Sequence, residues 1–162
     1  ERIGQGQVSR LFTPTLLHFD IFHIFFNMIW LMVLGKQMER RIGAVRYIVF
    51  ILAVALITNL CQYLMSGPNF LGFSGVVCGM IGYVWMRQSH APWEGYELQH
   101  VTVAFIAIFI LSLMAIQLTS FILEIRGDES FGPPIANTAH IVGALVGILF
   151  AKLPYFTGRI RV

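Results

Sequence analysis

The sequence GFSGVVCGMIGYVWM, residues 72–86, is almost entirely apolar except for Ser74 near its start. A second apolar stretch, ANTAHIVGALVGILFAKL at residues 136–153, carries His140 near its own start. A hydroxyl and an imidazole are costly to bury at membrane depth, so polar groups placed there are functional candidates by default. Together the two stretches indicate a serine nucleophile and its base inside a membrane, an arrangement suited to cutting a peptide bond there.

Composition places the chain among membrane proteins. Of its 162 residues, 57% are hydrophobic and only 12% are charged, whereas soluble domains carry about a quarter charged residues. The net charge of +3 is too small and too scattered to indicate a nucleic-acid partner. Cys61 and Cys78 fall in apolar segments without metal-ligand spacing, so we interpret them as small buried hydrophobic residues. No sequence feature calls for a metal or a cofactor.

Five hydrophobic segments predict an all-α, polytopic membrane helical bundle. Their expected ranges are Leu16–Leu34, Tyr47–Met65, Ser74–Met86, Val101–Ile122 and Ala136–Leu153. A membrane-spanning helix needs about 20 residues, so the third segment is too short to span alone. We expect its serine end to lie below the outer surface, met by residues 66–73. Irregular backbone at that depth must be shielded or line a water-filled cavity, and hydrolysis requires such a cavity.

The distribution of charge predicts an orientation. One side of the membrane receives eight basic residues: Lys36, Arg40, Arg41, Arg46, Arg87, Lys152, Arg159 and Arg161. The other side receives three basic and three acidic residues: Arg2, Arg10, Arg126, Glu124, Asp128 and Glu129. By the positive-inside rule the first side is cytoplasmic. The first, third and fifth segments then run inward, which places the candidate polar residues at comparable depth toward the outer leaflet.

Ser74 requires a base within hydrogen-bond reach, because serine is a poor nucleophile until its proton is removed. Two of the five histidines fall in a cytoplasmic connector: His90 and His100. The other three fall at the depth of the serine: His18, His23 and His140. No acidic residue lies at that depth, since Asp20 is expected at the outer interface. The sequence therefore favours a Ser-His dyad over a triad.

Small residues follow both members of this predicted pair. Gly75 and Gly79 follow the serine, and Gly143 and Gly147 follow the histidine. Faces made of small residues let two helix backbones approach closely. We therefore expect the third and fifth segments to pack together and bring Ser74 to His140.

Less specific interpretations remain open for these residues. A serine in a membrane helix commonly bonds back to a carbonyl of its own helix, and a lone histidine there can simply bridge two helices. An α/β-hydrolase is excluded, because its nucleophile elbow needs G-x-S-x-G between a strand and a helix. A transporter fragment would show internal repeats, and none is visible.

His23 and Asn27 lie four residues apart, on one face of a helix. Acyl transfer develops an oxyanion that needs hydrogen-bond donors already directed at it. The two side chains and the Ser74 backbone N–H could supply three donors, and the dipole at a helix N-terminus favours the negative charge. The alternative is that His23 and Asn27 only bridge helices.

Three motifs resemble those of a known family. HFDIFHIFFN at residues 18–27, GFSG at 72–75 and AHIVG at 139–143 are similar to the H-x4-H-x3-N, G-x-S-G and A-H-x-x-G motifs of the rhomboid intramembrane serine proteases, most closely the bacterial GlpG type. The resemblance covers nearly the whole chain in the same order. It implies that residues 1–162 form one rhomboid protease membrane domain with five helices of a six-helix core, the first being missing.

The resemblance also implies roles for particular residues. Ser74 would be the nucleophile and His140 the general base, with His23, Asn27 and the Ser74 amide forming the oxyanion hole. His18 would belong to a polar network that holds water near the site. Glu39 and Arg41 match a structural acid-base pair on the cytoplasmic side. Three small residues of the motifs would support the site: Gly72, Gly75 and Gly143.

Substrates and location follow from the same resemblance. The expected substrates are transmembrane proteins, in a lipid environment, with no nucleic acid or metal as partner. The expected location is a bacterial inner membrane, with the active site toward the periplasm. Two positions depart from the family: Cys78 replaces a tyrosine that packs against the base, and Ser9 replaces a tryptophan before Arg10. The alternative function is a catalytically inactive rhomboid-like pseudoprotease that binds transmembrane helices.

Overall fold

The computed structural model describes residues 7–127 and 136–157, and these residues form helices without strands. Five longer helices make up the body of the protein: α2 (Ile21–Ile42), α3 (Ala44–Ser66), α4 (Ser74–His90), α5 (His100–Ile125) and α6 (Asn137–Phe150). Shorter elements flank them: η1 (Val8–Leu11), α1 (Thr13–Leu16), η2 (Pro92–Glu94) and η3 (Pro154–Phe156). The predicted all-α bundle is therefore confirmed.

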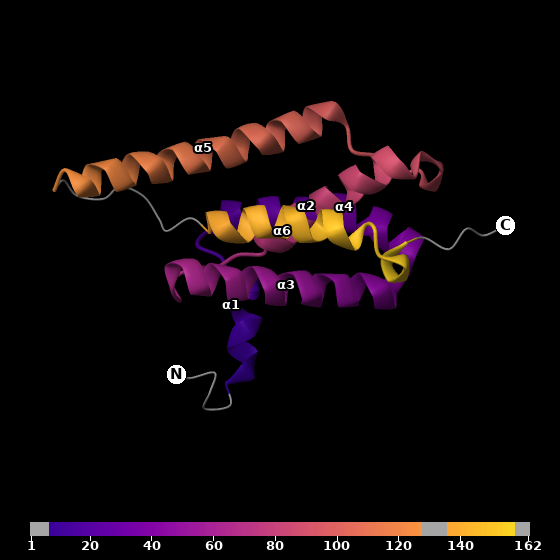
Figure 1. The fold of residues 1–162 in the computed structure, drawn as a ribbon, viewed down its shortest axis with the longest axis horizontal. Coiled ribbons are helices and arrows are strands. Elements are labelled where there is room, and N and C mark those ends of the chain that lie inside the picture. The colour runs from indigo at the N-terminus through magenta and orange to yellow at the C-terminus, as the bar shows by residue number, and fades with distance from the viewer. Residues whose placement is uncertain (1–6, 128–135, 158–162) are drawn as a thin grey trace.

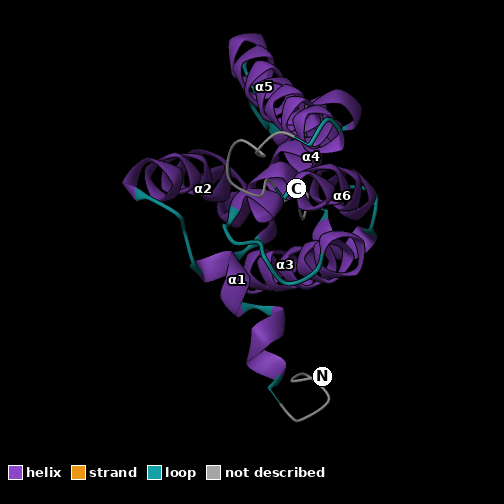
Figure 2. Ribbon diagram, turned by 90° about the vertical axis from the view of Figure 1, so that its left-hand side faces the viewer, coloured by secondary structure: helices purple, strands orange, loops and turns teal. Residues whose placement is uncertain are grey.

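Helix α4 is the centre of the bundle, with α2, α3 and α6 arranged around it (Figures 1 and 2). Ten of its 17 residues are buried. Among the described helices, α2, α3 and α5 are long and apolar enough to cross a membrane. Helix α5 stands apart from the others, and only 7% of its most apolar 18-residue stretch is buried.

Glycines allow the close packing of α4 against α6. A Cβ added at Gly143 would overlap the backbone carbonyl oxygen of Gly75, and one added at Gly147 would overlap that of Gly79. One turn further along, a Cβ at Gly82 would meet the backbone of Ala144. The two small-residue faces expected from the sequence therefore face each other, and this contact sets the distance between the helices that carry Ser74 and His140.

Gly143→Ala should separate α4 from α6, because the new methyl group meets backbone atoms that cannot rotate away. Forcing extra atoms into a packed contact costs about 3 kcal/mol, so we expect the unfolding free energy to fall by that amount. Denaturant titration of the detergent-solubilised protein measures it. The control is Leu145→Ala, on the exposed face of α6, where the side chain is 55% accessible. Equal unfolding midpoints for the two variants would contradict this packing.

The start of α2 differs from the sequence prediction. The helix begins at Ile21 rather than at residue 16, because the Asp20 carboxylate caps it by accepting a hydrogen bond from the His23 backbone N–H at 2.8 Å. The preceding turn, α1, is a separate element that starts with Pro14 in its first turn. His23 consequently lies in the first turn of α2, not two turns into it.

The C-terminal ends of α2 and α4 also differ from the sequence prediction. Helix α2 continues to Ile42, and a single residue, Gly43 with φ of 85°, joins it to α3. The basic residues between the first two expected segments, at positions 36–46, therefore lie mostly in helices, with Arg40 and Arg41 in the last turn of α2, where positive charge is favoured. Helix α4 reaches His90, four residues beyond the expected end.

Two of the eight basic residues used to predict the orientation, Arg46 and Arg87, join segments at one end of the bundle. The Arg46 guanidinium donates to the Thr157 carbonyl at 3.4 Å, and Arg87 donates to the Ala151 carbonyl at 3.0 Å and pairs with Glu94. These contacts join the start of α3, the end of α4 and the segment after α6. Five charged residues used to predict orientation lie outside the described residues: Arg2, Asp128, Glu129, Arg159 and Arg161.

The expected pairing of Glu39 with Arg41 is not observed. Arg41 instead donates to the backbone carbonyls of Glu94, at 2.7 Å, and of Gly95. Its guanidinium also lies 4.6 Å from the centre of the Tyr96 ring. Two residues apart on a helix, Glu39 and Arg41 point in different directions, which leaves the arginine free to hold the α4–α5 connector.

Candidate active site

Ser74 and His140 meet where α4 and α6 begin. Ser74 is the first residue of α4, and His140 is the fourth residue of α6. The Ser74 Oγ and the His140 Nε2 are 2.7 Å apart, a hydrogen bond that joins residues 66 positions apart in the sequence. His140 is only 7% exposed. The imidazole is therefore held at the distance a base needs to remove the hydroxyl proton.

Within residues 7–127 and 136–157, the second ring nitrogen of His140 has no acidic partner. His140 Nδ1 is buried and has no hydrogen-bond partner within the described parts of the chain. Asp20, the acidic residue within the motif at residues 18–27, is engaged in capping α2. The described geometry is thus that of a two-residue pair. In residues 7–127 and 136–157, no group of three or more His, Cys, Asp or Glu side chains is placed to hold a metal ion.

His23 lies beside the serine through a contact with Gly72. A Cβ built on Gly72 would lie 2.8 Å from His23 Nε2 and 3.7 Å from Ser74 Oγ. Gly72 also has φ of 122°, which side chains rarely adopt, and its N–H donates to the Pro14 carbonyl at 2.8 Å. Only glycine therefore fits between the imidazole of His23 and the start of α4.

His18 and Asn27 flank His23 on either side. The His18 ring packs edge-on against the His23 ring, with centroids 5.0 Å apart. Asn27 is 4% exposed, and its Nδ2 donates to the His23 carbonyl at 3.0 Å. The structure thus places His23 and Gly72 beside Ser74, with His18 packed against the ring of His23. The described hydrogen bond of Asn27 lies within its own helix, one turn deeper.

The comparison with known families agrees with this arrangement. The chain matches the family model of the rhomboid domain over residues 5–155, nearly its whole length. The protein belongs to the rhomboid family. Members of this family are intramembrane proteases or their inactive relatives, and they act on membrane proteins. The family assignment and the apolar helices together make this rhomboid an integral membrane protein.

Two polar residues of α3 near the site were missed by the sequence analysis. Gln62 accepts a hydrogen bond from the backbone N–H of Ala139 at 2.9 Å. Thr58 lies against Gly75, with its Oγ1 3.1 Å from the position of an added Cβ. Both are buried in this rhomboid. Their spacing of four residues in an otherwise apolar helix is a sequence signal that could have identified them.

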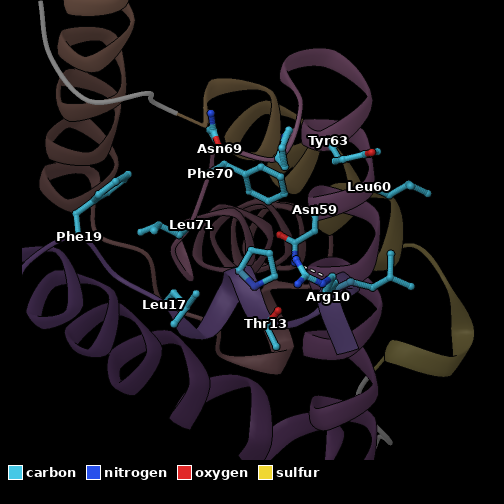
Figure 3. Close-up of a pocket in the computed structure, with 13 residues that line it drawn as sticks. Arg10, Thr13, Leu17, Phe19, Asn59, Leu60, Tyr63, Asn69, Phe70 and Leu71 are labelled. Atoms are coloured by element: carbon cyan, nitrogen blue, oxygen red, sulfur yellow. Dashed lines mark hydrogen bonds between the residues drawn. The ribbon is translucent and has the colours of Figure 1, made fainter. Parts of the chain in front are cut away.

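The larger of the two described pockets in this rhomboid is separate from Ser74 and His140. It has a volume of about 880 Å³ and lies between the N-terminal turns, α3 and the loop at residues 68–71 (Figure 3). Asn59 supports one wall, because its Nδ2 donates to the Leu11 carbonyl and to Thr15 Oγ1, both at 2.8 Å. The pocket borders the loop that leads to the serine but includes neither Ser74 nor His140.

Proposed function

We propose that this rhomboid is an intramembrane serine endopeptidase that hydrolyses peptide bonds in or near transmembrane helices of membrane-protein substrates. The observation that supports the proposal is the 2.7 Å contact between Ser74 Oγ and His140 Nε2. A buried hydroxyl and imidazole in this relation form a nucleophile and its general base. The alternative, an inactive pseudoprotease that binds transmembrane helices, would not require this contact.

The reaction proceeds in two halves. His140 Nε2 takes the hydroxyl proton as Ser74 Oγ bonds to the substrate carbonyl carbon, and it then donates that proton to the leaving amine as the peptide C–N bond breaks. Water attacks the resulting ester while His140 takes one of its protons. The Ser74–carbonyl bond breaks, and the proton returns to the serine oxygen. The enzyme is regenerated with the substrate cut into two chains.

Three groups are proposed to stabilise the oxyanion. The Ser74 N–H is free for this purpose because the first residues of a helix have no acceptor within it. The His23 ring lies beside Gly72 and the serine. Asn27 uses one of its two amide hydrogens on the His23 carbonyl, which leaves the second for a substrate oxygen.

Asn27→Ala should lower the turnover number by roughly 10² to 10³, the usual loss for one oxyanion donor, with little change in KM. Both constants are measured from the cleavage of a transmembrane substrate in detergent at several substrate concentrations. The matched control is Gln37→Ala, which removes an amide from the other end of α2, where Gln37 Nε2 donates to the Glu97 carbonyl at 3.0 Å. If Asn27→Ala turned over as fast as Gln37→Ala, Asn27 would be a packing residue only.

The proposed setting is a bacterial inner membrane with the site toward the periplasm. Arg46 and Arg87 contact the segment that follows α6, at the opposite end of that helix from His140, and under the positive-inside rule this supports the proposed orientation. Helix α5 is mostly unburied and stands apart from the other long helices (Figure 1). Small or helix-breaking residues should be preferred at the cut, since a helix must unwind to expose a peptide bond.

The deciding experiment is reaction with a fluorophosphonate, followed by mass spectrometry of the modified peptide. Covalent labelling needs an activated serine and no knowledge of the substrate, so we expect a single adduct on Ser74. Cleavage of a transmembrane substrate in proteoliposomes should accompany it. If the protein bound transmembrane helices without being labelled and without cleaving them, the protease assignment would be wrong and the pseudoprotease assignment would be favoured.

A further inference from the structure

Helix α6 begins without the usual cap. Its N-cap residue is Ala136, which has no side-chain oxygen to offer the first turn. The N–H groups of a first turn have no acceptor within the helix, and a capping side chain normally bonds the second or third of them. Ala139 is the third residue of α6, and its N–H is one of these groups. It is buried, so water does not readily satisfy it.

Gln62 supplies the missing acceptor from a different helix. Its Oε1 accepts the Ala139 N–H at 2.9 Å, across 77 positions of sequence. Gln62 is itself only 3% exposed. The bond is made one residue before His140, so it holds the turn of α6 from which the imidazole projects.

The same face of α3 also contacts the turn that carries the serine. Thr58 lies one turn before Gln62, and its Cβ is 3.2 Å from the position of a Cβ added at Gly75. That position is also 3.4 Å from the Ala139 Cβ. Neighbours of both Ser74 and His140 therefore rest on one short stretch of α3.

We propose that Gln62 is a positioning residue for the general base: by capping α6 at Ala139 it holds the His140 Nε2 against the Ser74 Oγ. The inference deepens the proposed protease function and rests on it. A displacement of about 1 Å at reacting groups can cost 10² in rate. Without this hydrogen bond, the first turn of α6 keeps its packing against α3 but loses the contact that fixes its position, and a shift of this size becomes possible.

Gln62→Met tests the proposal, because methionine keeps the length and volume of the side chain but removes the acceptor. We expect the rate of fluorophosphonate labelling, and the turnover number for a transmembrane substrate, to fall roughly 10- to 100-fold, with KM within a factor of about two. The matched control is Asn59→Leu on the same helix. Asn59 is also buried, and its amide donates two hydrogen bonds, but to Leu11 and Thr15 of the N-terminal segment.

The control separates positioning from general stability. We expect both variants to lower the unfolding midpoint and Gln62→Met alone to lose labelling. Labelling of Gln62→Met at the wild-type rate, or an equal loss in Asn59→Leu, would overturn the proposal. Should Gln62→Met fail to fold, Gln62→Asn, which draws the carbonyl back by one methylene, is expected to fold and to show the same loss; wild-type labelling there would overturn it equally.

Failure of the Gln62 proposal can be told apart from failure of the proposed protease function. If the wild-type protein neither labels nor cleaves, the protease assignment fails. If the wild-type protein labels and Gln62→Met labels just as fast, the protease stands and only the role of Gln62 falls.

Discussion

Ser74→Ala is expected to abolish fluorophosphonate labelling and to lower cleavage of a transmembrane substrate by on the order of 10⁴-fold or more. The reason is chemical, since the variant has no oxygen to form the acyl-enzyme. The described side-chain bond of Ser74 is to His140, so the fold should be retained. Cleavage is measured in proteoliposomes with matched protein amounts.

Ser112→Ala is the control for loss of a hydroxyl from a membrane helix. Ser112 Oγ bonds back to the Ile108 carbonyl of its own helix at 2.8 Å, the arrangement that a non-catalytic serine adopts. It should leave labelling and cleavage near wild type. Activity of Ser74→Ala above a few per cent of wild type would mean that another residue is the nucleophile.

His140→Ala is expected to be nearly as inactive as Ser74→Ala, because the hydroxyl then has no base to take its proton. The double variant should be no slower than either single variant, since residues that act as one unit do not contribute additively. Labelling rates of the three proteins at equal concentration measure this. A further large loss in the double variant would show that the two residues act separately.

His90→Ala and His100→Ala are the matched controls for removal of an imidazole. His90 ends α4 and His100 begins α5, so about 24 Å of helix separates His90 from Ser74. Both variants should remain close to wild type. If His100→Ala inactivated the protein as fully as His140→Ala, the assignment of the base would be wrong.

Much of the fold was predictable because membrane insertion leaves a strong signal in composition. Each of the five expected apolar segments corresponds to one of the helices α2–α6. Their ends were predicted less well, as the eight helical residues beyond Leu34 show. Hydropathy marks the part of a helix that lies in lipid, whereas helical hydrogen bonds continue through polar residues until a residue such as Gly43, with positive φ, ends them.

Some features of the candidate site could likewise be predicted from the sequence, and others could not. Ser74 and His140 stood out because polar groups in apolar helices are costly, and the glycines after each indicated that the two helices pack closely. The pairing of Arg41 could not be foreseen. Its partners are backbone carbonyls of a connector more than 50 positions away, and backbone carbonyls carry no sequence signal.

The sequence by itself determined the class of protein, the number of long helices and the candidate residues for the chemistry, because these depend on the polarity and size of individual side chains. Only the tertiary structure placed Ser74 Oγ 2.7 Å from His140 Nε2 and put Gln62 at the start of α6. Such distances depend on how closely α3, α4 and α6 approach one another, and that approach is the sum of many contacts between distant segments.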